Sequence, residues 1–334
     1  MELMAGVSRS GMEDSMARKE EKKKHVWLRA ILITLGVLIV ACSGVLLKAY
    51  LDVKDMTDAV YVPVSKENMR AEDGGSDSTD LIGRKEPFSV LLLGTDTGGL
   101  GRTEQRGRTD TIMVATVNPN DKSVKILSIP RDTRTEIIGR GTVDKINHAH
   151  AFGGVEMTVN TVQNFLNIPI DHYVLVNLSG FETVVDALGG VTVENTMAFS
   201  LDGFDFPVGT ISLNGEEALA FARMRYEDPE GDFGRNRRQR NLVTAMAKKA
   251  LSLEGMLNYQ SILDSLRDSM QTDLTLQDLT TLVLSYRQCA ESISQYDTLP
   301  GVGKTIDGVW YWIPNMDEVY KISSELRQHL ELSN

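Results

Sequence analysis

The chain has 334 residues, of which 42% are hydrophobic and 24% are charged, the composition of an ordinary globular protein whose core needs no disulfide bonds. Its net charge of −11 argues against non-specific nucleic-acid binding, so no nucleic-acid partner is expected. Five histidines and two cysteines leave little material for a zinc site. The H-x-H pair His148 and His150 is expected to have a structural or helix-capping role, with metal binding as the alternative.

The first predicted element is a membrane-spanning helix. Residues 30–47 form an 18-residue run without a charge. With residues 26–28 in front, this run reaches about 30 Å as a helix, enough to cross a bilayer. Six Lys and Arg residues precede the run closely, and two follow it. The positive-inside rule therefore places residues 1–25 in the cytoplasm, makes residues 26–48 a single-pass anchor in the cell membrane, and puts the remainder outside.

The two cysteines lie in different contexts. Residues 39–42 (Ile-Val-Ala-Cys) resemble a lipoprotein processing box, so lipidation of Cys42 after cleavage stays open as an alternative. The apolar run continues past Cys42, which favours an uncleaved anchor. Cys289 is the only cysteine after the anchor, so it has no partner for an internal disulfide and is expected to be a buried thiol.

Residues 49–85 are polar and include the acidic, low-complexity stretch AEDGGSDSTD at 71–80. This composition predicts an extracellular linker or stalk. The pattern of a folded domain begins at residue 86 and is expected to continue to residue 334.

Strands and helices alternate along this domain. Apolar runs predict strands at Phe88–Leu93, Thr111–Val117, Val124–Ile129, Tyr173–Val176, Val191–Val193 and Val309–Ile313. Helical spacing and capping residues predict helices around 155–166, 181–188, 214–222, 237–251, 262–270, 276–286 and 315–330. The turn Asn118-Pro119-Asn120-Asp121 makes the second and third strands a hairpin, so the sheet should be mixed. The expected fold is α/β, a three-layer α-β-α sandwich around a mixed central sheet behind one N-terminal transmembrane helix.

The loop GTDTGGLGRTEQRGRTDT, Gly94–Thr111, combines glycines and arginines with carboxylates. It matches neither a Walker loop nor a dinucleotide fingerprint, because it joins a strand to a strand and lacks the required Gly-Lys-Ser/Thr or helix. Asp96 follows the first strand and Asp110 precedes the second, so both carboxylates should lie at one edge of the sheet. Such a pair is costly unless a cation lies between them, and Mg²⁺ commonly binds one or two carboxylates together with substrate phosphates. The loop therefore predicts a magnesium–phosphate site, with a solvated turn as the alternative.

Arginines recur in two later segments. The first, SIPRDTR at 128–134, contains Arg131 and is followed by Lys145. The second is ARMRYEDPEGDFGRNRRQR at 222–240. In an extended segment Arg223 and Arg225 would point the same way, and on a helix Arg235 and Gln239 would share a face. This density suits bidentate phosphate recognition, although ion pairs with neighbouring acidic residues are expected to account for some of the arginines. Arg237 and Arg240 lie off the Arg235–Gln239 helix face and are expected to face solvent or these acidic neighbours.

These motifs resemble the LytR-CpsA-Psr (LCP) family of cell-wall glycopolymer transferases. The matching stretches are LLLGTDTGG, GRTDTIMVATVNP, KILSIPRDTR, DKINHAHAFGG, DHYVLVNLSGFETVVDALGGV and LNGEEALAFARMRYEDPEGDFGRNRRQR. They cover about residues 88–245 in the family's order, behind the family's membrane anchor.

The resemblance implies transfer of an anionic glycopolymer, such as teichoic acid or capsule, from an undecaprenyl-pyrophosphate carrier onto peptidoglycan. It implies Mg²⁺, or alternatively Mn²⁺, held by Asp96 and Asp110, with Arg108 beside them in the catalytic group. The substrate-binding positions that it implies are Arg131, Lys145, Arg223, Arg225, Asp232, Arg235 and Gln239. An aspartate could take the proton from the acceptor hydroxyl, and Asp96 is the candidate.

Two other functions stay open at this stage. A polyprenyl-pyrophosphate pyrophosphatase would use the same site with water as the acceptor. A non-enzymatic membrane regulator of cell-wall genes would need no turnover. The identity of the glycopolymer and the oligomeric state are left undetermined by the sequence.

Overall fold

The computed structural model describes residues 51, 54–55, 58–66, 69–72, 80–97, 107–250, 269–296 and 299–332. The predicted anchor at 26–48 and the tail before it lie outside the described residues. Among the residues described, no helix is long and apolar enough to cross a membrane. Residues from Lys54 onward form one compact unit, and the fold is that of this unit.

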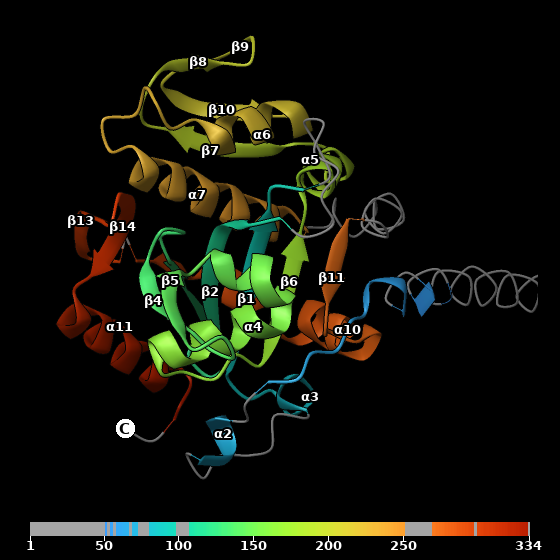
Figure 1. The fold of residues 1–334 in the computed structure, drawn as a ribbon. Helices are drawn as coiled ribbons and strands as arrows, with labels where there is room; N and C mark the ends of the chain where they lie inside the picture. Colours follow the sequence, from blue (N-terminus) through green and yellow to red (C-terminus); the bar gives the residue numbers. More distant parts are fainter. Residues whose placement is uncertain are drawn as a thin grey trace, which may run out of the picture. The chain divides into compact units, whose positions relative to one another are not determined.

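A six-stranded mixed sheet lies at the centre of this unit (Figure 1). Its strands are β1 (Phe88–Thr95), β2 (Thr109–Asn118), β3 (Ser123–Ser128), β6 (His172–Val176), β11 (Met270–Thr272) and β12 (Ile293–Gln295), in the order β11-β6-β1-β2-β3-β12. The β1–β2, β2–β3 and β6–β11 pairs are antiparallel, whereas β1–β6 and β3–β12 are parallel. The predicted mixed sheet and its β2–β3 hairpin are therefore confirmed.

Local chemistry explains why the β2–β3 hairpin forms where the sequence predicts it. The side-chain oxygen of Asn118 accepts hydrogen bonds from the backbone N–H groups of Asn120 and Asp121 at 2.8 and 3.1 Å. This Asx arrangement closes the turn before the chain reverses. On β1, residues 88–91 are all buried, as expected for a strand covered on both faces.

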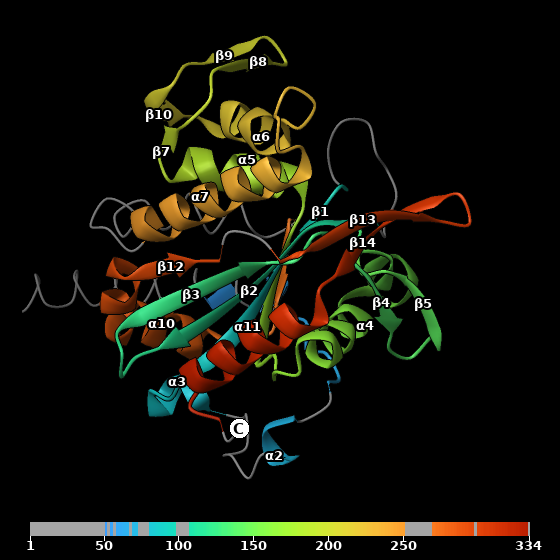
Figure 2. The same ribbon diagram turned by 90° about the vertical axis from the view of Figure 1, so that its left-hand side faces the viewer.

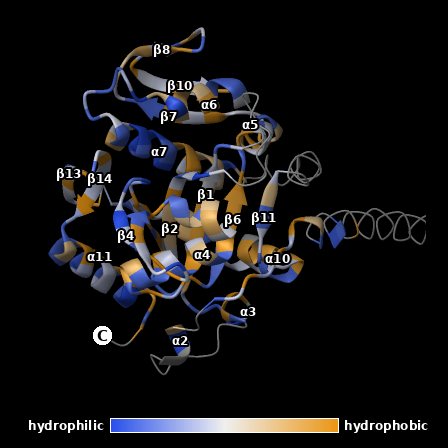
Figure 3. Cartoon of the chain, in the orientation of Figure 1, coloured by the Kyte–Doolittle hydropathy of each residue, from blue (hydrophilic) through white to orange (hydrophobic). Residues whose placement is uncertain are grey.

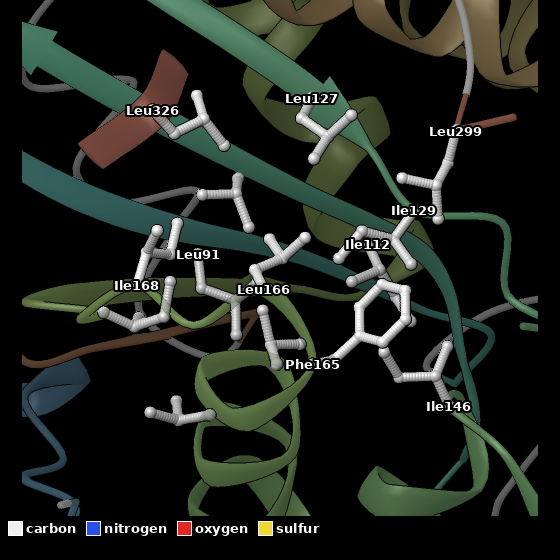
Figure 4. Close-up of a cluster of buried hydrophobic side chains, with 14 of the residues drawn as sticks. Leu91, Ile112, Leu127, Ile129, Ile146, Phe165, Leu166, Ile168, Leu299 and Leu326 are labelled. Carbon is white, nitrogen blue, oxygen red and sulfur yellow. The ribbon is translucent and has the colours of Figure 1, made fainter. Parts of the chain in front are cut away.

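Helices cover both faces of the sheet. On one face lie α4 (His148–Leu166) and α11 (Met316–His329), whose apolar residues join Leu91, Ile112 and Leu127 in the main core (Figure 4). On the other face lie α3 (Leu81–Arg84), α10 (Leu276–Ser285) and the 3₁₀ helix η1 (Arg287–Glu291). Cys289 is buried in this second cluster, and its burial raises the thiol pKa, so the predicted buried thiol is confirmed.

A second, smaller core lies beside the central sheet, and no sequence pattern predicted it. It is built from α5 (Leu178–Ala187), α6 (Gly215–Arg223), β7 (Val191–Asn195), β8 (Phe199–Leu201), β9 (Phe204–Phe206) and β10 (Gly209–Leu213). Phe199, Phe206 and Phe221 pack together at its centre, with ring centroids 4.7–5.6 Å apart. The predicted capping box of α6 is present, because Asn214 and Glu217 exchange hydrogen bonds.

The helix α7 (Asp232–Ala250) connects the two cores. Leu242 is buried in the smaller core, whereas Val243 packs against the central sheet. The helix begins at Asp232, five residues before the predicted start at Arg237, so its first turn includes Arg235. Of the helix predicted at 262–270, only the last two positions are described, and Met270 belongs to β11.

Two hairpins border one end of the sheet (Figure 2). The first is β4 (Arg134–Ile137) with β5 (Thr142–Lys145), and the second is β13 (Gly301–Ile306) with β14 (Val309–Pro314). They are joined by the backbone hydrogen bond from the Trp312 N–H to the Asp132 carbonyl at 2.9 Å. Asp132 directly follows Arg131, so both hairpins are tied to a segment with a predicted site residue.

The folded unit begins earlier than the predicted boundary at residue 86. The short helix α2 (Met69–Glu72) carries Arg70, which is 5% exposed and pairs with Asp171 through contacts of 2.6 and 2.8 Å. Val60 is also buried, and the Val62 N–H donates to the Thr272 carbonyl at 2.8 Å. Part of the segment predicted to be a linker is therefore integral to the domain.

Candidate functional site

The two predicted metal-binding aspartates lie on adjacent strands at one end of the sheet. The backbone N–H of Asp96 donates to the Arg108 carbonyl at 3.3 Å, and the Arg108 N–H donates to Asp96 Oδ1 at 3.0 Å. The register shifts here, because Gly94 faces Thr111 while Thr95 faces Thr109. Asp110 is thus the extra residue of a β-bulge, a feature that re-aims a side chain. The prediction that both carboxylates share one sheet edge is confirmed.

Gly107 and His150 position the end of the β1–β2 loop beside Asp96. Neither residue was predicted to do so. A Cβ on Gly107 would lie 2.3 Å from Asp96 Oδ1, so only glycine allows this close approach. His150, buried on α4, lies with Nδ1 2.9 Å from the Gly107 carbonyl. Since a carbonyl only accepts, Nδ1 carries the proton. The H-x-H pattern indicated a structural role for this histidine, but only the fold shows what it contacts.

Arg131, directly after the end of β3, connects this edge to the next loop. Its Nη1 lies 2.7 Å from Asp110 Oδ1. Asp132 then pairs with Lys145 on β5 at 2.7 Å. Burial lowers the pKa of Arg131, but the carboxylates of Asp110, Asp232 and Asp132 outweigh it and raise the pKa overall. The Arg131 side chain is therefore positively charged and is held in place by Asp110.

The first turn of α7 adds a second arginine, and this one is buried. Arg235 is 6% exposed, and its Nη2 lies 2.7 Å from Asp232 Oδ1, while Arg225 Nε lies 3.6 Å from the same oxygen. Burial lowers the pKa of Arg235, and the positive charges of Arg131 and Arg225 add to this effect. The Nε atoms of Arg131 and Arg235 have no hydrogen-bond partner among the described residues. Unsatisfied donors of this kind suit an anionic ligand with several oxygens.

The structure thus brings together most of the predicted site residues. We call them the arginine–aspartate cluster, which consists of Asp96, Arg108, Asp110, Arg131, Arg225, Asp232 and Arg235, with Lys145 joined to it through Asp132. The members come from the two ends of the β1–β2 loop, the start of β2, the β3–β4 loop, β5, the segment between α6 and α7, and the first turn of α7. Figure 3 shows α7 largely in the colour of hydrophilic residues, although it packs between two cores.

Arg223 is placed differently from the prediction, whereas Gln239 lies on α7 four residues after Arg235, so the prediction that the two share a helix face is confirmed. Arg223 is the last residue of α6 rather than part of an extended segment, and it pairs with Asp202 at 3.0 Å. It therefore does not share an extended face with Arg225, because the two are separated by the end of a helix. Gln239 donates from Nε2 to the Ala222 carbonyl at 3.4 Å, which holds α7 against the end of α6.

The remaining arginines of the segment separate into exposed and buried groups. Arg237 forms an exposed ion pair with Glu230, as predicted. Arg238 forms a buried ion pair with Asp228 at 2.6 Å. The prediction that Arg240 faces solvent or acidic neighbours was wrong about solvent, because its side chain is 1% exposed. The expectation that acidic neighbours engage some of these arginines is confirmed.

Comparison with known proteins gives the family of the chain. The LytR_cpsA_psr family model matches residues 48–328. A relative from Enterococcus faecalis, named polyisoprenyl-teichoic acid–peptidoglycan teichoic acid transferase TagU, is 46% identical over 88% of this chain and 94% of its own length. The crystal structure of TagU from B. subtilis has 41% identity and a TM-score of 0.61, covering 75% of this chain and 99% of that one. A structure of TagT bound to LI-WTA has 32% identity and a TM-score of 0.63, covering 77% and 94%.

The family match spans the segments that carry the arginine–aspartate cluster, and the identities to TagU extend over nearly the whole length of the relative. The mixed sheet found here is also the one shared with the solved structures. On these grounds the chain belongs to the LytR-CpsA-Psr family.

Proposed function

We propose that this chain transfers an anionic glycopolymer from an undecaprenyl-pyrophosphate carrier onto a peptidoglycan hydroxyl, forming a phosphodiester and releasing undecaprenyl phosphate. The names of the relatives support teichoic acid as the polymer. The observation that carries the proposal is the cluster itself, in which the partly buried Arg131 and the buried Arg235 are cations whose Nε donors have no partner among the described residues. Such groups bind a diphosphate and stabilise the charge that develops on its leaving phosphate.

Asp96 and Asp110 would hold a divalent cation, Mg²⁺ or alternatively Mn²⁺. Two carboxylates from adjacent strands are the donor set that Mg²⁺ takes when phosphate oxygens and water complete its shell. A bound cation would supply charge stabilisation to the bridged diphosphate. The chain's own groups would do the rest: Arg131 and Arg235 orient the diphosphate, and the Asp96 carboxylate accepts the proton of the acceptor hydroxyl.

The test is product analysis with full-length protein in detergent, a short-chain polyprenyl-pyrophosphate polymer and peptidoglycan. Transferase activity predicts polymer covalently attached to peptidoglycan, together with polyprenyl monophosphate. Equal release of monophosphate without peptidoglycan would instead identify a pyrophosphatase. No release under either condition would favour the regulatory alternative.

The arginines of α7 provide a test of donor binding. Arg235→Ala should weaken binding of the polyprenyl pyrophosphate at least tenfold, because losing a desolvated charge-assisted contact costs roughly 2–5 kcal/mol. The neighbouring exposed cation offers a matched control, since Arg237→Ala removes the same charge from the same helix and should change binding less than about threefold. Isothermal titration of each purified variant measures both. Equal losses would show that a diffuse positive field, not the cluster, binds the donor.

We also propose that the domain lies outside the cell membrane, with residues 1–25 in the cytoplasm and residues 26–48 as the anchor. The support is the excess of Lys and Arg before the uncharged run. Protease added to intact protoplasts should digest the domain and leave only the N-terminal tail protected. A protected domain would contradict this topology and, with it, the access to peptidoglycan that the transfer requires.

A further inference from the structure

The β13–β14 hairpin carries an exposed aromatic surface that the reaction described above does not use. Trp310 is 45% exposed and lies on β14 two residues before Trp312, which is 9% exposed. In the register of the hairpin, Trp310 pairs with Thr305 and Trp312 pairs with Gly303. The two tryptophans project from the same face of the hairpin. Each indole lies diagonally across from a glycine of β13, Trp310 beside Gly303 and Trp312 beside Gly301.

The glycines allow the indole rings to lie against the opposite strand. A Cβ on Gly303 would lie 3.0–3.2 Å from three indole atoms of Trp310, and one on Gly301 would lie 2.8 Å from Nε1 of Trp312. A Cβ at Gly303 would require the Trp310 ring to shift by a few tenths of an ångström, and a larger side chain would displace it further. One face of the indole thus lies against Gly303, while Trp310 is 45% exposed to solvent.

The same face of the hairpin leads to the arginine–aspartate cluster. Trp312 packs edge-on against Phe233 with ring centroids 4.7 Å apart, and Phe233 directly follows Asp232. The Trp312 Nε1–H donates to the Leu299 carbonyl at 3.1 Å, which fixes its ring. Trp310 lies two residues farther along the strand, about 6–7 Å away. Trp312 and Phe233 therefore lie between Trp310 and the Asp232 end of the cluster.

The other face of the hairpin is bordered by cations. Lys145 Nζ lies 5.8 Å and Arg134 Cζ lies 5.9 Å from the centroid of the Tyr311 ring. Lys145 is also the partner of Asp132, so these cations link the hairpin to the loop of Arg131. The Tyr311 face of the hairpin is thus linked to the loop that carries Arg131.

We propose that Trp310 is a stacking platform for the sugar rings of the peptidoglycan strand that supplies the acceptor hydroxyl. This proposal rests on the proposed function and names the surface that binds its second substrate. Pyranose rings present C–H groups with slight positive charge, which the negative face of an indole attracts. That same face repels phosphate oxygens, which the anionic donor carries in its diphosphate. The acceptor therefore fits Trp310 better than the anionic polymer of the donor.

The experiment measures co-sedimentation of the full-length protein, in detergent, with peptidoglycan sacculi stripped of wall polymers. Trp310→Ala should weaken binding about fivefold or more, whereas Trp310→Phe should keep most of it. Gly303→Val keeps Trp310 but fills the space against which its indole lies, so it should also weaken binding to the sacculi. Tyr320→Ala, which removes a 62% exposed aromatic side chain from α11, is the matched control and should bind like the parent.

A parallel titration with polyprenyl pyrophosphate separates this proposal from the proposed function. All variants should bind the donor within about twofold of the parent, because Trp310 lies outside the arginine–aspartate cluster. Unchanged sedimentation of Trp310→Ala would overturn the proposal and would favour another contact, such as a membrane surface. Equal losses in Tyr320→Ala would show non-specific adhesion, and lost donor binding in Trp310→Ala would assign the platform to the donor. A parent that binds sacculi but not the donor would contradict the proposed function alone.

Discussion

Asp110→Asn should lower the rate of polymer transfer by at least about 100-fold, because cation binding and charge stabilisation each contribute several kcal/mol to such a reaction. The substitution removes a negative charge but preserves the shape of the side chain. It also removes the charged partner that lies 2.7 Å from Nη1 of Arg131. The initial rate of polymer attachment, measured over a range of Mg²⁺ concentrations, gives the effect on turnover and on cation dependence.

The loss should be specific to this end of the sheet. Asp96→Asn should behave like Asp110→Asn, whereas Asp121→Asn, in the turn at the opposite end of β2, should keep the parent rate. The free energy of unfolding should change by less than about 1 kcal/mol in each variant, since both site carboxylates are partly exposed. Full activity of Asp110→Asn, or activity that survives chelation of divalent cations, would show that the cation site is assigned to the wrong residues.

The sequence predicted correctly those elements that are determined by interactions between residues close together in the chain. The β2–β3 hairpin follows from turn residues that hydrogen-bond to their own neighbours, and the α6 capping box joins two residues three positions apart. The buried residues of α11, Val319, Ile322, Leu326 and Leu330, recur at the spacing of one helix face. In each case the sequence within about ten residues contains the whole reason for the structure.

Contacts between distant residues were not predictable in this way. Arg70 lies in a polar stretch that reads as a linker, and its partner Asp171 is 101 residues away. Nothing near Arg70 indicates that its guanidinium will be buried. The smaller core was missed for a similar reason, because its strands are only three to five residues long and form a cluster only once α7 packs across them.

The candidate site was predicted as a set of residues more accurately than as a geometry. The carboxylates could be placed because both adjoin strands of one hairpin, so their separation depends on β-pairing alone. The arginines between residues 222 and 240 could not be placed from the sequence, because their positions depend on where α6 ends and α7 begins. A helix that starts at Asp232 directs Arg235 into the cluster and Arg238 into the smaller core, although the two are three residues apart.

Arg238 should consequently be essential for stability rather than for binding. Its guanidinium pairs with Asp228 at 2.6 Å and donates to the carbonyls of Phe221 and Met224 at 3.2 and 2.5 Å. The side chains of Arg238 and Asp228 are 7% and 3% exposed. Arg238→Ala would leave the Asp228 carboxylate buried without its cation, and breaking a buried pair in this way costs about 3–5 kcal/mol.

Arg237→Ala is the matched control, because its ion pair with Glu230 is 39% and 52% exposed and such pairs contribute about 0–1 kcal/mol. Thermal unfolding of the two variants should differ by roughly 10 °C, with Arg238→Ala the lower. Arg238→Met offers a further comparison, since an apolar chain fills the site but still leaves Asp228 unpaired, so it should recover only part of the loss. The double variant Arg238→Met with Asp228→Asn should recover more, because no uncompensated charge stays buried. If Arg238→Ala unfolds at the parent temperature but loses donor binding, Arg238 belongs to the site and the division between structural and binding arginines on α7 is wrong.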